Sequence, residues 1–249
     1  MSIIQAIIRE PDIVSLIGQQ YEEFIHVNRR YNSLRPDDKY KLEQCSTKFT
    51  LGTNTLDGVF WVSGRIAFEK CHSNRDSISF DFSGCWMARL KSGEGDFTFH
   101  ISTDTYEPRD CKMHFLRYLN EHYESINDIS IFQPLSGYDR HCSLINMFLT
   151  PKDNESERRV WGVITQTGEC YSIIVDAQCY ELNENEGYRC FKYSLYAIIK
   201  HPKFGKEILQ QPEVLNFLNS GASFKERSKV MEGIWTENYK RLQYLYRAK

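Results

Sequence analysis

The spacing of apolar residues changes along the chain. Between residues 3 and 25 they recur every three or four positions, which predicts two short helices or one helix kinked at Pro11. From about residue 47 to 199 apolar and polar residues alternate in short runs broken by Gly, Asn and Pro, which predicts strands. Helical spacing returns at 111–123 and again after Pro202, up to about residue 247.

This order of elements predicts an α+β fold in which N- and C-terminal helices cover largely antiparallel or mixed β-sheets, arranged as one sheet or as a two-sheet sandwich. The expected strands include 126–132, 144–149 and a hairpin formed by 159–164 and 170–175. At 249 residues the chain fits a single domain over 1–249. Its parts would be a helical N-terminus at about 1–30, a β-rich core at about 47–199 and a helical C-terminus at about 203–247.

The strongest local signal is a predicted hairpin between residues 77 and 103. Two alternating runs flank a polar, glycine-containing break at 91–96. A turn centred between Ser92 and Gly93 would set Cys85 directly opposite His100. Directly opposed residues have Cβ atoms about 4.5 to 5.5 Å apart, so the thiol would reach the imidazole. A slip of one residue would turn the two side chains to different faces.

A cysteine beside a histidine on neighbouring strands can act as nucleophile and base, because the imidazole takes the thiol proton and later protonates the leaving group. Ser83 and Gly84 come immediately before Cys85. Glycine permits a bulge that would aim the thiol outward and present the Cys85 N–H to an oxyanion. These residues are therefore candidates for a catalytic site.

The run Phe82-Ser83-Gly84-Cys85, with His100 fifteen residues later, resembles the Leu-Ser-Gly-Cys and His pattern of the cytotoxic necrotizing factor deamidases. It is also similar to the pattern of the bacterial lethal-factor deamidases and the chemoreceptor deamidases. In that family the cysteine attacks the side-chain amide of a glutamine in a target protein. The resemblance therefore implies a bacterial effector or toxin that acts on a protein substrate bearing an exposed glutamine and needs no metal or organic cofactor.

The resemblance also implies a role for each matching residue. Cys85 would be the nucleophile, His100 the base and Ser83 a pocket residue beside the nucleophile. The toxins carry an asparagine upstream of their cysteine, to which Asn54 corresponds, and Gly52 just before it could supply a carbonyl. A downstream tyrosine of the toxins falls near Tyr180.

A third group must hold the imidazole ring of His100. The hairpin face offers two hydroxyls, Ser79 and Ser102, and the break at 52–54 offers a backbone carbonyl. Ser79 stands where some members of the resembled family have a threonine that orients the histidine, whereas Phe82 replaces their usual leucine. The three alternatives stay open at this point.

Charge and hydropathy narrow the expected partners. The chain has 31 Lys and Arg against 33 Asp and Glu, which argues against a nucleic-acid backbone as the main partner. It has no apolar run long enough to span a membrane, and charges at residues 9, 10 and 12 interrupt the N-terminal apolar stretch, so we expect neither a membrane span nor a secretory signal. A cytoplasmic location follows, and export to a host cell by a route without a cleaved signal is compatible with it.

The eight cysteines give no sign of a metal site. None forms a C-x-x-C pair, so we expect reduced thiols. Cys71-His72 and His141-Cys142 contain metal-ligand types without the paired spacing of structural zinc sites. We therefore expect no metal and no cofactor.

The alternative is a structural role for the same pair. Buried free cysteines are common, so Cys85 could be a core residue and His100 a strand histidine bonded to a neighbouring group. The chain would then be a non-catalytic partner-binding protein of the immunity or adaptor type. A thiol-reactive probe separates the two interpretations, because only an activated cysteine should be labelled first.

Overall fold

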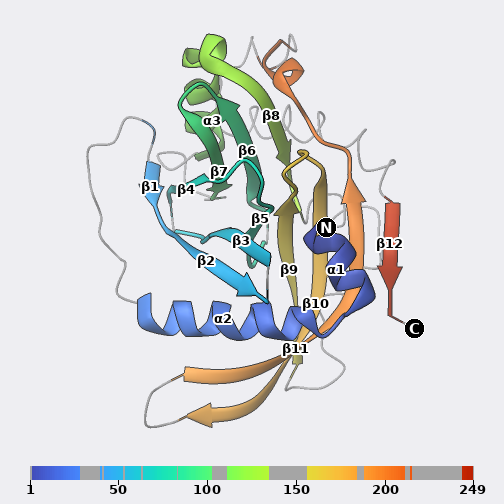
Figure 1. The fold of residues 1–249 in the computed structure, drawn as a ribbon. Helices are drawn as coiled ribbons and strands as arrows, with labels where there is room; N and C mark the ends of the chain where they lie inside the picture. The colour runs from blue at the N-terminus through green and yellow to red at the C-terminus, as the bar shows by residue number, and fades with distance from the viewer. Residues whose placement is uncertain are drawn as a thin grey trace.

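The structure is a computed structural model that describes most of the chain. The described residues are 2–28, 40, 42–52, 54–62, 64–82, 84–102, 111–134, 156–183, 188–210, 214 and 243–248. Their strands form two sheets that pack face to face (Figure 1).

The smaller sheet has five strands, which are β1 (Leu42–Gln44), β4 (Ile66–Cys71), β6 (Trp86–Ser92), β7 (Gly95–Ile101) and β8 (Ile126–Phe132), in the order β1-β4-β7-β6-β8. The larger has seven strands, which are β2 (Ser46–Leu51), β3 (Asn54–Val59), β5 (Ser77–Ser79), β9 (Ser156–Ile164), β10 (Cys170–Asn183), β11 (Tyr188–His201) and β12 (Gln243–Arg247), in the order β12-β11-β10-β9-β5-β3-β2. β1 pairs with β4 and β3 with β5 in parallel, and the other pairs are antiparallel. The predicted α+β fold with largely antiparallel sheets is confirmed, as a two-sheet sandwich.

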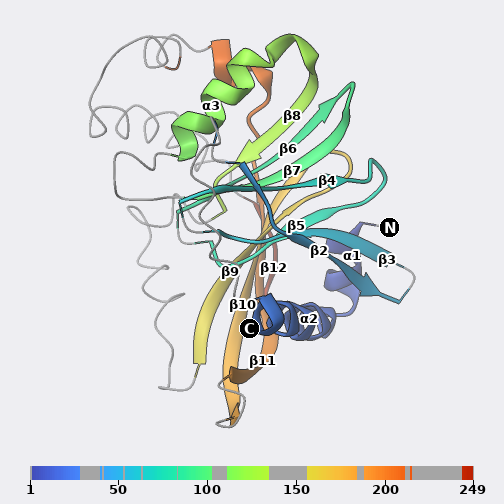
Figure 2. The ribbon, with the colours of Figure 1, turned by 90° about the vertical axis from the view of Figure 1, so that its left-hand side faces the viewer.

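Helices cover the outer face of each sheet (Figure 2). α1 (Ile3–Arg9) and α2 (Ile13–Asn28) pack on the seven-stranded sheet, and α3 (Cys111–Glu121) packs on the five-stranded sheet. α1 begins after Ser2, whose hydroxyl accepts the Gln5 N–H, and ends before Pro11. The predicted N-terminal helices and the helix after residue 111 are confirmed.

The layers enclose two apolar cores. One lies between the sheets and continues under α3, where the rings of Phe99 and Phe115 are 5.1 Å apart. The other lies between the two N-terminal helices and the seven-stranded sheet. Its centre is Phe80, whose ring contacts Tyr21 at 4.2 Å and Trp161 at 5.2 Å between centroids.

Alternate residues of β7 face opposite layers, as the two-residue period of a strand requires. Phe99 faces α3. Thr98 and His100 face the seven-stranded sheet, where their side chains meet Ser77 and Ser79 of β5, each at 2.7 Å. These two polar contacts join the sheets across the interior of the sandwich.

The register of the β6–β7 hairpin corrects the prediction that Cys85 faces His100. Met87 pairs with His100 and Ser92 pairs with Gly95, so the turn is Gly93-Glu94 and lies one residue later than predicted. The polar residues that flank the turn are part of the strands rather than of the loop. They pair in sequence, and the Ser92 hydroxyl donates to the Gly95 carbonyl.

The apolar run 78–90 is not one strand, which corrects a second expectation. β5 ends at Ser79 in the seven-stranded sheet, and β6 begins at Trp86 in the other sheet. The backbone between them adopts positive φ at Asp81 (53°) and Gly84 (134°), conformations that interrupt an extended strand. The segment 80–85 is therefore a crossover between the sheets, and Cys85 lies at its end.

The C-terminal helix is also corrected where the structure describes it. Gln243–Arg247 forms β12, which pairs with β11 at the edge of the seven-stranded sheet. The three residues at its centre, Tyr244-Leu245-Tyr246, are all apolar or aromatic, a composition that favours a strand. Lys206–Gln210 is a short 3₁₀ helix. Apart from residue 214, the predicted helices at 211–242 lie outside the described residues, and so does the predicted strand at 144–149.

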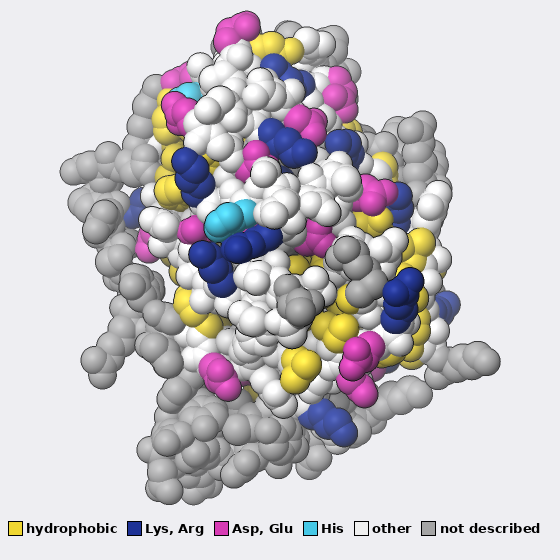
Figure 3. Space-filling view, viewed as in Figure 1, with side chains coloured by type: hydrophobic (Ala, Val, Ile, Leu, Met, Phe, Trp, Pro, Cys, Tyr) yellow, Lys and Arg dark blue, Asp and Glu magenta, His cyan; other side chains and the backbone are white. Residues whose placement is uncertain are grey.

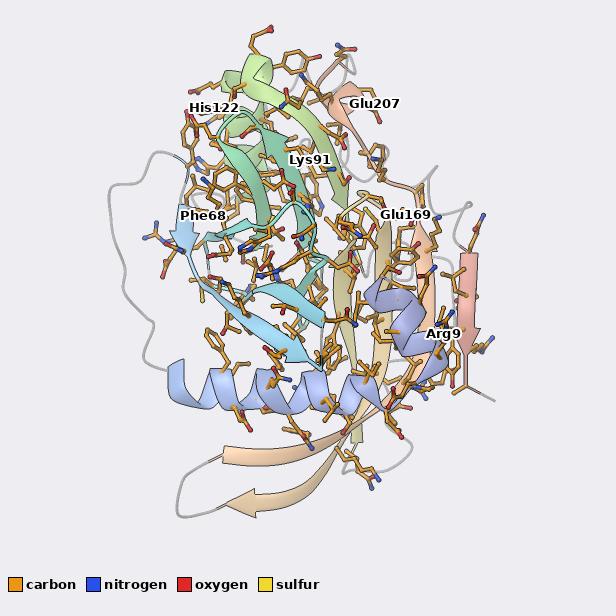
Figure 4. The ribbon with its side chains drawn as sticks, in the orientation of Figure 1. Arg9, Phe68, Lys91, His122, Glu169 and Glu207 are labelled. Carbon is orange, nitrogen blue, oxygen red and sulfur yellow. The ribbon has the colours of Figure 1, made fainter. Side chains whose placement is uncertain are left out.

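The surface carries charges of both signs. On the face seen in Figure 3, Lys and Arg side chains are interspersed with Asp and Glu. Lys91 of β6 donates to the Gln166 carbonyl at 3.1 Å, in the β9–β10 turn that leads to Glu169 (Figure 4).

Within the described ranges, no helix combines the length and apolar character needed to cross a membrane.

Candidate functional site

Cys85 lies one residue before β6, and extension of the β6–β7 register places it diagonal to His100 at the end of the hairpin. The last pair of the ladder is Trp86 with Ile101. Continuing it by one step sets Cys85 opposite Ser102 and diagonal to His100. Diagonal neighbours have Cα atoms about 7 to 8 Å apart, and their side chains can still meet. The two-residue shift from the predicted register keeps the thiol and the imidazole on one face, because side chains alternate with a period of two.

Two hydrogen bonds hold Gly84, near the end of the crossover segment, close to the five-stranded sheet. The Gly84 carbonyl accepts Gln133 Nε2 at 2.8 Å, just beyond β8, and Lys112 Nζ at 2.9 Å, from α3. The Lys112 ammonium lies 5.0 Å from the centroid of the Trp86 ring, which therefore faces α3. Successive side chains of a strand point to opposite faces, so Cys85, the residue before Trp86, is directed away from α3. That direction is the interior of the sandwich, which His100 also faces.

A hydrogen-bonded chain from the seven-stranded sheet fixes the His100 ring. Ser79 Oγ lies 2.6 Å from the Val59 carbonyl and 2.7 Å from His100 Nδ1. The carbonyl can only accept, so the hydroxyl donates its proton to Val59 and Nδ1–H of His100 donates to Ser79. Nε2 then carries the lone pair, and it makes no hydrogen bond with any described residue. This tautomer is the one that a general base requires.

The pair is closed to solvent in this structure. Cys85 is 3% exposed and His100 0%. The Phe82 ring stacks on the imidazole with centroids 4.3 Å apart and an interplanar angle of 7°. Gly162 makes room for this ring, since a Cβ there would lie 2.9 Å from both Phe82 Cε2 and Met87 Sδ. A substrate can reach the pair only if side chains that cover it move.

Two of the other predicted site residues lie away from the pair. Gly52 and Asn54 form the β2–β3 turn, at the opposite end of β3 from Val59. Five residues of strand separate Asn54 from Val59, roughly 16 Å. The break at 52–54 therefore supplies neither the carbonyl near His100 nor an oxyanion contact, and the carbonyl in this position is that of Val59.

The remaining two predicted residues are less fully described. Ser83 lies outside the described residues. Tyr180 lies at a β-bulge in the part of β10 that extends beyond its pairing with β9 and projects past α2 with β11 (Figure 1). Its side chain is not among those that the structure describes.

Comparisons with known proteins add one distant neighbour. No family model matches the chain, and no curated protein matches it. One solved structure that aligns with it is the C-terminal domain of CNFy from Yersinia pseudotuberculosis, with a TM-score of 0.28 and 11% identity. The alignment covers 61% of this chain and 63% of that one, less than two thirds of its length. A similarity this weak carries no argument about function.

The sequence analysis missed the contribution of Trp61. Its indole Nε1–H donates to Ser102 Oγ at 3.0 Å, and its side chain is 51% exposed. A signal was present in the sequence, since Val59-Phe60-Trp61-Val62 is an unbroken apolar run. β3 ends at Val59, so Trp61 lies in the connection that follows the strand. Trp61 therefore lies at the surface beside the end of the hairpin that carries His100.

Three of the other described thiols have little tendency to ionise at neutral pH. Burial raises the pKa of Cys45 to about 11, and it also raises the pKa of Cys71 and of Cys170. None of the five cysteines whose side chains are described forms a disulfide. No group of His, Cys, Asp or Glu in the described residues could hold a metal ion. A thiol-reactive probe should therefore label Cys45, Cys71 and Cys170 only slowly at neutral pH.

Burial of two histidines predicts a loss of stability in acid. Burial lowers the pKa of both His100 and His201 to about 3. Unfolded histidine has a pKa of about 6.5. Between those values the unfolded chain binds more protons, so the free energy of unfolding should fall as the pH drops through this range. Urea unfolding midpoints at about pH 7 and about pH 4.5 measure the effect.

Single histidine variants isolate this effect from carboxylate titration. His100→Gln and His201→Gln should each flatten the dependence of the midpoint on pH, because each removes one proton that binds only on unfolding. His122→Gln is the matched control, since the His122 side chain is exposed. An equal flattening in all three variants would contradict the assignment.

Proposed function

We propose that this chain is a protein glutamine deamidase in which Cys85 is the nucleophile and His100 the general base. The observation that carries the proposal is the Val59–Ser79–His100 chain, which leaves an unprotonated Nε2 on the face of the hairpin shared with Cys85. Burial lowers the pKa of His100 to about 3, so the imidazole is neutral at neutral pH. The same burial weakens the ring as a base, and the ring gains basicity when the side chains that cover the pair move and admit solvent.

The proposed reaction has two stages. In the first, His100 Nε2 takes the thiol proton while Cys85 Sγ adds to the carboxamide carbon of a glutamine. The tetrahedral oxyanion collapses as His100 returns the proton to the departing nitrogen, which releases ammonia and leaves a thioester. In the second, His100 deprotonates water, which attacks the thioester and releases glutamate and the Cys85 thiol. Neither stage requires a metal or an organic cofactor.

Backbone geometry before the nucleophile supports this chemistry. Gly84 has φ of 134°, a conformation that other residues rarely adopt. It turns the chain at the point where the crossover segment enters β6, and the Cys85 N–H follows directly. A backbone N–H next to the attacking sulfur is a common oxyanion donor. The choice of a protein glutamine as substrate rests on the resemblance of 82–85 and His100 to the deamidase pattern.

Selective labelling and product analysis test the proposal together. An iodoacetamide probe at neutral pH should label Cys85 before Cys45, Cys71 and Cys170, whose pKa values burial raises. Incubation with a cell extract, followed by mass spectrometry, should reveal glutamine converted to glutamate at defined sites, with release of ammonia. Cys85→Ser should lose both. A parent protein that neither labels at Cys85 nor converts any glutamine would overturn the proposal.

The second candidate function is non-catalytic partner binding. The near-complete burial of Cys85 and His100 favours it, because a histidine held by Ser79 inside the sandwich can be purely structural. Under this interpretation labelling of Cys85 should be as slow as that of Cys170. Cys85→Ala would then change stability without changing the reactivity of the chain toward electrophiles.

A further inference from the structure

We infer that Ser102, held by the indole of Trp61, donates a hydrogen bond to the oxyanion that forms at Cys85. This inference rests on the proposed function and adds a third catalytic side chain and a positioning residue to that site. It follows from three observations: the place of Ser102 in the hairpin, the donor and acceptor inventory of its hydroxyl, and the exposure of Trp61.

The register of the hairpin places Ser102 beside the proposed nucleophile. It follows the last residue of β7, and its backbone N–H donates to the Arg65 carbonyl at 3.2 Å, so its main chain is fixed. Extension of the β6–β7 register sets it opposite Cys85. Ser102 shares the interior face with His100, because the two are separated by one residue of the strand. The base and the hydroxyl therefore flank the thiol from successive positions of β7.

The Ser102 hydroxyl donates no hydrogen bond to any described residue. The Trp61 indole can only donate, so Ser102 Oγ is the acceptor in their contact at 3.0 Å. Among the described residues no acceptor receives the proton of Ser102, although the side chain is 1% exposed. The buried hydroxyls of Ser79 and Ser172 differ, since they donate to the carbonyls of Val59 and Pro134.

A buried donor without an acceptor costs free energy, and an oxyanion that accepted its hydrogen bond would remove that cost. A buried polar group without a partner costs about 1 to 3 kcal/mol. The hydrogen bond from Trp61 polarises the Ser102 hydroxyl, which strengthens the bond that the hydroxyl then donates. A donor fixed in this way before reaction stabilises charge that appears only in the transition state. The geometry thus suits an oxyanion contact better than a structural one.

Trp61 connects the buried Ser102 hydroxyl with the protein surface. Its Nε1–H is directed inward to Ser102, and half of its surface faces solvent. A substrate that approaches the hairpin end would therefore contact the indole ring before it reaches the hydroxyl. Trp61 acts through Ser102 and is a positioning residue.

Two reactions at the same thiol separate oxyanion stabilisation from thiol activation. Acylation of Cys85 by p-nitrophenyl acetate passes through a tetrahedral oxyanion, whereas alkylation by iodoacetamide does not. Ser102→Ala should slow acylation roughly 100-fold, the usual effect of removing one oxyanion donor. Alkylation of the same variant should stay close to the parent rate. Nitrophenolate release and mass spectrometry of the Cys85 peptide measure the two rates.

Conservative variants give the inference further readouts. Ser102→Thr keeps a hydroxyl and should recover most of the acylation rate. Trp61→Phe keeps an aromatic ring but removes the N–H, so it should lower acylation less than Ser102→Ala does and leave alkylation unchanged. Ser77→Ala is the matched control, because it removes a buried hydroxyl that contacts Thr98 instead of the hairpin end, and it should not change the ratio of the two rates.

The outcomes distinguish this inference from the proposed function. A parent protein without preferential reaction at Cys85 overturns both. A reactive Cys85 whose acylation is unchanged in Ser102→Ala overturns only the role of Ser102. An equal loss of acylation and alkylation in that variant also overturns it, since the hydroxyl would then act on the thiol or on the fold.

Discussion

Replacing His100 by alanine is expected to slow acylation of Cys85 by about 10² to 10⁴-fold, the range that a positioned general base contributes. The reason is the Nε2 lone pair, which the Ser79 and Val59 contacts leave available on the face that Cys85 shares. Single-turnover acylation by p-nitrophenyl acetate and glutamine conversion in a target mixture measure the loss.

His201→Ala is the matched control for this variant. His201 is also buried, its pKa is also lowered to about 3 by burial, and it also contacts a serine, at 2.7 Å from Ser172. It lies on β11 rather than on the hairpin that carries His100. The control should lose stability without losing the acylation rate. Parent-like acylation in a folded His100→Ala protein would rule out a base role for this histidine.

Replacing Phe80 by alanine should lower the free energy of unfolding by about 3 to 5 kcal/mol, as expected for removal of a sealed aromatic ring. Phe80 is 1% exposed and lies at the start of the crossover segment. Its ring contacts those of Tyr21, Phe49 and Trp161 at 4.2 to 5.2 Å between centroids. Urea unfolding followed by tryptophan fluorescence measures the change.

Phe68→Ala is the comparison for Phe80→Ala, because it removes the same side chain from a half-buried position on β4 (Figure 4). Its ring lies 6.3 Å from that of Phe99. Since part of this ring is already in contact with water, the loss should be smaller, about 1 to 2 kcal/mol. Equal losses in the two variants would show that the cluster around Phe80 is not the centre of the core.

The elements near the site could be read from the sequence, but their register could not. The alternating runs predicted the β6–β7 hairpin, and the structure confirms that these strands pair. The turn was placed one residue too early because a polar break indicates where a chain reverses without showing how far each strand extends into it. Lys91 and Asp96 are polar, yet they pair within the ladder. The predicted direct opposition of Cys85 and His100 became a diagonal one for this reason.

The partner of the His100 ring illustrates the same limit. The sequence offered Ser79, Ser102 and the break at 52–54 as equal alternatives. Only the packing of one sheet on the other brings Ser79 within 2.7 Å of Nδ1, and the same packing sets the Val59 carbonyl behind it. Distance along the chain does not distinguish these alternatives, because each depends on which strands lie face to face.

Periodicity determined the secondary structure where side chains alternate or recur regularly, because those periods reflect how each element buries one face. It also determined that His100 lies on a hairpin whose first strand begins directly after Cys85. The tertiary structure alone decided that the chain crosses between sheets at 80–85 and that residues 243–247 add a strand at an edge. It also decided that Ser79, from the other sheet, holds the His100 ring. These features arise from contacts between segments far apart in sequence, and no local pattern of apolar and polar residues records them.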